Sequence, residues 1–186
     1  MSVNIQLEWT PNPSTLKYVV DRQLIPSGAF NFTSLEKAKE ESPLAARLME
    51  ITGVVGVMVG ASFVTVTKGD EGEWDELNES VMEALDGHLG ADAPVVTEEA
   101  LAARNRPSEG GSDVENQIRA VLDAEIRPAV MQDGGDILLD RYEGGVAYLH
   151  MRGSCAGCPS STATLKIGIE SRLRELIPDL VDVVAV

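Results

Sequence analysis

Alternation of apolar and polar residues predicts several β-strands in the first half of the chain. Val3, Ile5, Leu7 and Trp9 are separated by single polar residues, which is the period of a half-buried strand. Runs rich in β-branched and aromatic residues predict further strands at 16–21, 29–33, 54–59 and 63–67. Only three residues, Gly-Ala-Ser, separate the last two runs, so these are expected to form a hairpin.

Two stretches of the first half have helical spacing. Ser42 and Pro43 open one predicted helix, with serine as the N-cap and proline at the first helical position, and this helix continues to Ile51. A second helix is predicted by the apolar stripe formed by Trp74, Leu77, Val81 and Leu85. Strands combined with such helices favour an α+β module with an antiparallel sheet.

The second half is predicted to run helix, strand, strand, helix, strand. Apolar spacing over 114–130 indicates a helix that Pro128 is expected to bend or end. A second helix opens at Pro159 and stops before Pro178. The predicted strands lie at 137–142, 146–151 and 180–186.

Between the two halves the sequence reads TEEALAARNRPSEGGS, which starts with a short helical-looking piece and then loses periodicity. We therefore expect two domains, at residues 1–95 and 113–186, joined by a flexible linker over 96–112. The expected fold class is α+β, with two small α/β-sandwich-type domains. The second has the order α-β-β-α-β and a Cys-x-x-Cys motif at a helix N-terminus.

The charge balance excludes some classes of partner. Among 186 residues, 30 are acidic and 15 are basic, which gives a formal net charge of −15. Nucleic acid and anionic membranes are poor partners for such a chain, because binding them requires clustered Lys and Arg. No apolar run approaches the roughly 18–20 residues of a membrane span. The first residues have neither a secretory signal pattern nor an Arg-rich one, so a cytoplasmic location is expected.

The chain contains two cysteines, Cys155 and Cys158, separated by Ala156 and Gly157. Two thiols at this spacing can face one point, since small residues let the loop bend and Gly157 tolerates a positive φ. Pro159 at the first helical position makes Cys158 the expected N-cap. The helix N–H groups then favour thiolates and can donate to the sulfides of a cluster.

A count of ligands limits what the Cys155 and Cys158 pair can do. An all-cysteine [4Fe–4S] or [2Fe–2S] cluster takes four thiolates, and structural zinc likewise takes four Cys or His ligands. One chain supplies two, so either two chains each give a pair or other ligands complete the set. Three interpretations stay open on the residues alone: a shared cluster or metal site, a thiol–disulfide enzyme, and unreactive thiols.

The residues around the cysteines resemble the Nfu family of iron–sulfur scaffold and carrier proteins. The second half is similar to the NifU C-terminal domain, and the matching segments are 126–128 (IRP), 133–136 (DGGD), 153–161 (GSCAGCPSS), 164–166 (TLK) and 168–170 (GIE). The first half resembles the Nfu N-terminal domain through 10–13 (TPNP), 15–17 (TLK), 53–54 (GV), 63–67 (FVTVT) and Trp74. Ser154 departs from the pattern, because alanine is common there in the family.

The resemblance implies a function and a set of partners. It implies that Cys155 and Cys158 of each of two chains hold one cluster, usually [4Fe–4S] with [2Fe–2S] possible, at the interface of a homodimer. The cluster would pass to apo iron–sulfur proteins, with other scaffolds upstream. The N-terminal domain would recognise clients or partners. No catalytic motif is evident, so the chain is expected not to be an enzyme.

Other residues have mainly structural interpretations. The segment 133–136 (DGGD) fits a tight turn with Asp capping better than a cation site. His150 lies outside ligand spacing, and His88 lies near the end of a helix, where a cation suits the helix dipole. The hydroxyls of 160–162 are expected to form hydrogen bonds in the first turn of a helix; the alternative is hydrogen bonds toward the cluster. Trp9 and Trp74 are expected to anchor the first core, although an exposed Trp would be a candidate partner site.

Overall fold

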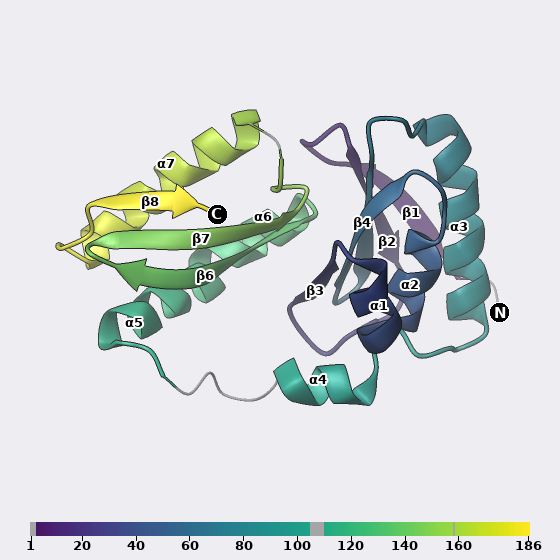
Figure 1. Ribbon diagram of the computed structural model, residues 1–186, viewed down its shortest axis with the longest axis horizontal. Helices are drawn as coiled ribbons and strands as arrows, with labels where there is room; N and C mark the ends of the chain where they lie inside the picture. The colour runs from purple at the N-terminus through teal and green to yellow at the C-terminus, as the bar shows by residue number, and fades with distance from the viewer. Residues whose placement is uncertain (1–2, 105–109, 158) are drawn as a thin grey trace. The chain divides into compact units, whose positions relative to one another are not determined.

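The computed structural model describes residues 3–104, 110–157 and 159–186. The chain divides into two units, Met1–Pro107 and Ser108–Val186, each with its own hydrophobic core. Figure 1 shows the elements of both units. The expected α+β fold class, with two small mixed domains, is confirmed.

An antiparallel sheet forms the framework of the first unit. Its strands are β1 (Ile5–Trp9), β2 (Thr15–Val20), β3 (Ala29–Phe32), β4 (Val54–Gly60) and β5 (Phe63–Lys68). They lie in the spatial order β1-β2-β5-β4-β3, so β1 and β3 are the edge strands. Leu16, Tyr18 and Val20 of β2 alternate with residues of the opposite sheet face and enter the core, as their period of two predicts.

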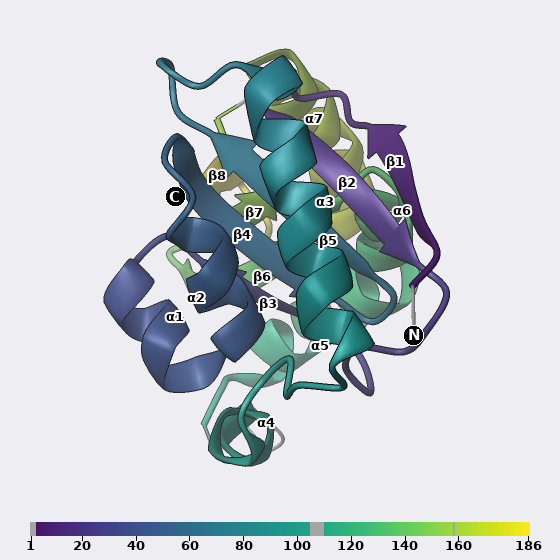
Figure 2. The ribbon, with the colours of Figure 1, turned by 90° about the vertical axis from the view of Figure 1, so that its right-hand side faces the viewer.

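Helices cover one face of this sheet, as Figure 2 shows for α1 (Leu35–Glu41), α2 (Pro43–Met49) and α3 (Trp74–Gly90). The predicted start of α2 is confirmed, because the Ser42 hydroxyl accepts a hydrogen bond from the backbone N–H of Ala45 at 3.1 Å. Helix α1 was not predicted. It buries only Ala38, and so narrow an apolar stripe leaves little helical signal in the sequence.

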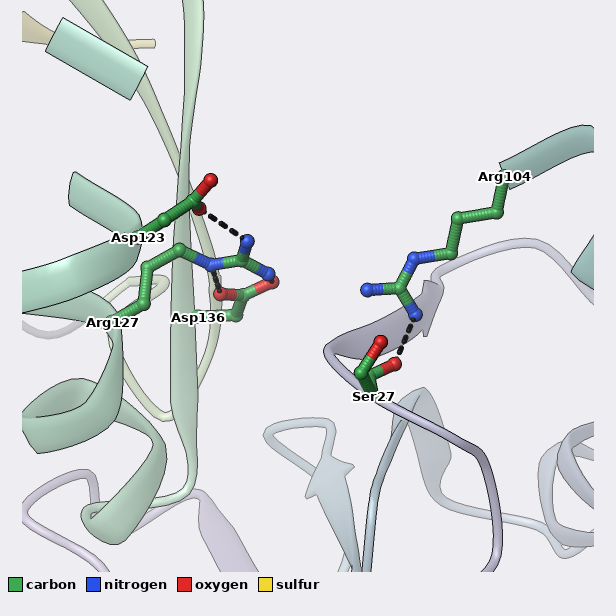
Figure 3. A network of polar contacts seen from close by, with 5 residues as sticks. All are labelled: Ser27, Arg104, Asp123, Arg127 and Asp136. Carbon is green, nitrogen blue, oxygen red and sulfur yellow. Dashed lines mark hydrogen bonds and ion pairs between the residues drawn. The ribbon is translucent and has the colours of Figure 1, made fainter. Parts of the chain in front are cut away.

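The start of the expected linker is packed on the first unit. Helix α4 (Glu98–Arg104) places Ala100 in the first core, together with Val96 before it. The Arg104 guanidinium donates to the Ser27 carbonyl at 2.8 Å (Figure 3). It also lies 4.8 Å from the centre of the Phe30 ring. The structured part therefore extends beyond the expected boundary at residue 95. Residues 105–109 of the expected linker lie outside the described residues.

The second unit has the expected order α-β-β-α-β. Its elements are α5 (Asp113–Val121), the π-helical turn η1 (Leu122–Ile126), α6 (Arg127–Gln132), β6 (Gly135–Glu143), β7 (Val146–Gly153), α7 (Pro159–Leu176) and β8 (Asp182–Ala185). β6 and β7 are antiparallel, and β8 adds parallel to β7. Helices pack on one face of this sheet (Figure 1) and enclose a core that includes Cys155.

Pro128 lies inside a continuous helical stretch and does not end it. The chain stays helical from Asp113 to Gln132, and the π turn η1 directly precedes α6. In that wider turn the Arg127 N–H reaches the carbonyl of Leu122. Widening the turn accommodates the proline ring, which would otherwise meet the carbonyl four residues earlier.

The two tryptophans of the first unit have different environments. Trp74 packs against the first core, and its indole N–H donates to the Pro13 carbonyl at 2.9 Å. Trp9 is 74% exposed, so the expectation that it anchors the core is wrong. Periodicity places Trp9 on the helix-covered face of the sheet, but it cannot show that the helices stop short of this residue.

Among the described residues, the structure contains no helix with the length and apolar character that a membrane span requires.

Candidate functional site

The cysteine loop begins where β7 ends, beside the start of β6. Gly153 pairs with Gly135 across the two strands. The backbone then turns, since the Ala156 N–H donates to the Gly153 carbonyl at 3.1 Å. Gly157 has φ +75°, a conformation that favours glycine, as the sequence predicted.

Ser154 fastens this loop to the segment before β6. Its side chain is almost fully buried, and its hydroxyl donates to the Asp133 carbonyl at 2.6 Å. Its backbone N–H donates to the Gly134 carbonyl at 3.1 Å. Alanine at this position could form only the backbone hydrogen bond, so the serine hydroxyl adds a second hydrogen bond between the two segments.

Cys155 is buried, with 7% of its surface exposed, because it lies directly against Gly135. A Cβ atom added to Gly135 would lie 2.3 Å from the Cys155 Sγ, far inside van der Waals contact. It would also lie 3.2 Å from the Cys155 backbone nitrogen. Gly135 therefore makes room for the sulfur, a role that the sequence analysis missed.

The segment 133–136 is part turn and part strand. Gly134 has φ +79° in the turn, while Gly135 and Asp136 already belong to β6. Asp136 is completely buried. It does not offer a free ligand to a cation, because its carboxylate already has a cationic partner.

That partner is Arg127, whose guanidinium forms two hydrogen bonds with Asp136. Nε lies 2.8 Å from Oδ1, and Nη2 lies 3.1 Å from Oδ2. The third nitrogen, Nη1, donates to Asp123 at 2.7 Å, so two carboxylates flank the guanidinium (Figure 3). Burial alone would lower the pKa of Arg127, but its hydrogen bonds to Asp136 and Asp123 outweigh burial and raise it. The two hydrogen bonds between this guanidinium and the buried carboxylate hold α6 to β6 beside the cysteine loop.

A second arginine lies across from Asp136. Arg152 is its register partner on β7 and is half-buried. Burial lowers the pKa of Arg152, the positive Arg127 lowers it further, and the negative Asp136 opposes both. Sequence spacing alone did not indicate that these two arginines converge on one buried carboxylate.

The far side of the loop leads into α7. The Thr162 hydroxyl donates to the Cys155 carbonyl at 3.3 Å, which joins the loop to the first turn of this helix. Cys158 lies outside the described residues, so its expected role as the N-cap stays a prediction. The same holds for the hydroxyls of 160 and 161.

The two histidines do not join the cysteine site. His150 is exposed on β7, and its neighbour Met151 points to the opposite face, into the core that contains Cys155. His88 is buried in the first unit, with Nε2 3.0 Å from the Pro94 carbonyl. Within the described ranges, no three His, Cys, Asp or Glu side chains form a group that could hold a metal ion.

Comparison with known families matches both units. The family described as "Scaffold protein Nfu/NifU N terminal" matches residues 5–92, and the "NifU-like domain" matches residues 118–184. A solved structure titled as a NifU-like protein from Saccharomyces cerevisiae is 22% identical, with a TM-score of 0.47 over 52% of this chain and 87% of the other.

Curated relatives cover nearly the whole chain. The human NFU1 iron–sulfur cluster scaffold homolog, a mitochondrial protein, is 37% identical over 95% of this chain and 69% of its own length. The Arabidopsis thaliana mitochondrial NifU-like protein 4 is 38% identical over 95% of this chain and 63% of its own length. The chain thus spans about two thirds of these relatives.

The expected cytoplasmic location is wrong, because these relatives are named as mitochondrial proteins. That expectation was drawn from the first residues of a chain that spans only part of its relatives, and those residues do not determine the location. The resemblance noted from the motifs, by contrast, is confirmed over both units. The chain belongs to the Nfu/NifU family of iron–sulfur cluster scaffold proteins.

Proposed function

We propose that this protein carries a [4Fe–4S] cluster on Cys155 and Cys158 of each of two copies and delivers it to apo-proteins. It acts as a scaffold and carrier and not as an enzyme, with the cluster as its cargo. A [2Fe–2S] cluster would also satisfy four thiolates. The second unit holds the cluster, and the first unit recognises partners.

One observation carries this proposal: the loop bearing Cys155 is fixed to a rigid edge of the second unit. Ser154 ties the loop to the turn before β6, and the absent side chain of Gly135 makes room for the sulfur. The buried pair of Asp136 and Arg127 then fixes that end of β6. The ligands of a metal centre need to be held in position by the packing and the hydrogen bonds of the residues around them.

Burial of Cys155 also suits a cargo site. With 7% of the residue exposed, the Cys155 thiol is shielded from oxidants. Because one chain supplies only half of the ligands, the partner's identical loop supplies the other half.

The test is anaerobic reconstitution of the full chain with ferrous iron and sulfide. Native mass spectrometry should find one cluster per two chains, and the reconstituted protein should activate an apo-enzyme that needs a [4Fe–4S] cluster. Cys155→Ser and Cys158→Ser should each abolish loading. Ala156→Ser, which alters the same loop but keeps both thiols, should load normally.

The rival functions give different results in the same experiments. A structural zinc dimer would bind zinc without sulfide and would not activate the apo-enzyme. A thiol–disulfide enzyme would turn over a disulfide substrate with no iron present. Full loading of either cysteine variant would refute the proposal.

A further inference from the structure

The outer strand of the first unit exposes apolar side chains where a covered face would be expected. β1 lies at the edge of its sheet and pairs only with β2 among the described strands. Leu7 is 39% exposed and Trp9 is 74% exposed. An edge strand with an exposed indole and an unpaired row of backbone groups is a ready template for another chain.

The strand register shows which face carries these two side chains. Leu7 lies opposite Tyr18, and Trp9 lies opposite Leu16, both of which are buried in the first core. The Tyr18 hydroxyl donates to Asn78 of α3 at 3.1 Å, so α3 passes over this part of the sheet (Figure 2). Leu7 and Trp9 therefore extend the core face of the sheet beyond the cover that α3 provides.

A shallow groove continues this exposed strip along α3. Its volume is about 690 Å³, and it is lined by Val3, Asn4, Ile5, Glu79, Met82, Glu83 and Asp86. Its lining combines apolar residues, Val3, Ile5 and Met82, with three carboxylates, Glu79, Glu83 and Asp86, which we call its acidic rim. The Asp86 carboxylate accepts a hydrogen bond from the Val3 N–H at 3.0 Å, which holds the chain before β1 against the helix. We call this groove, together with Leu7 and Trp9, the Trp9 surface.

The rim belongs to a long acidic stretch without counter-charge. The residues from Asp70 to Asp86 include eight Asp or Glu and no Lys or Arg, and no Lys or Arg occurs between Lys68 and Arg104. None of these eight carboxylates forms an ion pair within the described residues. Edge strands are often protected by lysine, but β1 contains no Lys or Arg, and Lys17 of the neighbouring strand is paired with Glu8 of β1. Such a field attracts a basic partner and repels an acidic one.

We propose that the Trp9 surface binds an extended segment of another protein that alternates basic and apolar residues. The segment adds to the outer edge of β1 through backbone hydrogen bonds. One of its apolar side chains packs on the Trp9 indole, while its basic side chains pair with Glu79 and Glu83. The inference goes beyond the cluster site, because it needs neither cysteine.

A second copy of this chain does not fit the same surface. Pairing two β1 strands about a two-fold axis would bring two identical acidic rims together. A heterologous basic strand does not meet this objection.

The proposal is tested on the full chain, without cluster, using a short synthetic peptide of alternating lysine and valine. Titration should show saturable binding that weakens as salt increases. Amide exchange should show new protection at the outward-pointing N–H groups of β1, which ordinary charge attraction would not produce. A peptide with glutamate in place of lysine should not bind.

Matched variants locate the site. Trp9→Ala, and separately the pair Glu79→Gln with Glu83→Gln, should each weaken binding about tenfold. Glu98→Gln with Glu99→Gln removes the same charge from exposed positions on α4 and should leave binding unchanged, as should Val55→Ala at another exposed apolar site. These side chains are exposed, so the variants should fold normally.

Three results would overturn the inference. Equal weakening by the α4 pair would indicate a general charge effect. Binding without protection of β1 would exclude strand addition, and a dimer of the cluster-free chain that Trp9→Ala dissociates would show a second copy on this surface. Loss of cluster loading in the cysteine variants should leave peptide binding intact, so the two proposals can fail separately.

Discussion

The two units use charge in opposite ways. In the second unit, Asp136 and Arg127 are buried and paired beside the cysteine loop. In the first unit, the carboxylates of α3 are exposed and lie beside an uncovered strand. Buried, paired charge fixes the geometry of a site within the chain, whereas exposed, unpaired charge leaves a surface for another molecule. The comparison therefore predicts that charge substitutions change stability in the second unit and recognition in the first.

The largest effect is expected from Asp136→Asn. It leaves the buried Arg127 guanidinium without its bidentate partner, and the free energy of unfolding of the second unit should fall by about 3 kcal/mol. Hydrogen exchange resolved by residue should show the loss in the second unit only. Asp140→Asn, in a half-exposed pair with Arg141, should cost less than about 1 kcal/mol. An equal loss of unfolding free energy in both variants would contradict the expectation that the buried, paired charge matters more than the exposed one.

Gly135→Ala should have the next largest effect. The new methyl group overlaps the Cys155 sulfur, so stability should fall by about 2 kcal/mol and cluster loading should fall with it. Gly168→Ala is the matched control, because a Cβ at that helical position meets nothing within 4 Å. It should stabilise the unit by roughly 0.5–1 kcal/mol and leave loading unchanged. Normal loading of Gly135→Ala would show that the sulfur does not depend on this packing.

A smaller effect, confined to the first unit, is expected from Ser42→Ala. The buried hydroxyl caps α2 through Ala45 and donates to the Val95 carbonyl at 2.5 Å. Its loss should lower the free energy of unfolding by about 1 kcal/mol. Ser34→Ala should have almost no effect, since this N-cap side chain makes no capping hydrogen bond. Denaturant titration of both variants, followed by amide signals of the first unit, measures the difference.

The smallest effect concerns the acid stability of the second unit. Glu115 accepts hydrogen bonds from the backbone N–H groups of Ser112 and Tyr142, which lower its pKa. Because the pKa of the folded state lies below that of the unfolded state, the stabilisation is present near neutral pH and is lost as pH falls through the folded value. Glu115→Gln should therefore flatten the dependence of second-unit stability on pH in the acid range. Glu99→Gln, in the first unit, should leave this pH dependence unchanged. Acid unfolding of the three proteins measures the difference, and an unchanged pH dependence in Glu115→Gln would contradict the prediction.

Much of the fold could be predicted because its signals are local. The strand of Val3 to Trp9, the Ser42 cap and the order of the second unit all follow from short-range periodicity and capping. The predictions failed where tertiary packing decides the outcome. Helix α1 has too little apolar content to be recognised, and α4 is held in place by contacts of Arg104 with Ser27 and Phe30.

The sequence by itself determined which chemical groups this protein has: two thiols at close spacing, a glycine that lets their loop bend and a strong negative charge. Only the tertiary structure decided that Gly135 makes room for the Cys155 sulfur, that Arg127 and Asp136 form a buried pair, and that Trp9 is uncovered. The physical reason is that a residue type fixes which bonds a side chain can make, and periodicity fixes which face it occupies. Whether another element covers that face depends on contacts between segments distant in sequence, which no local pattern records.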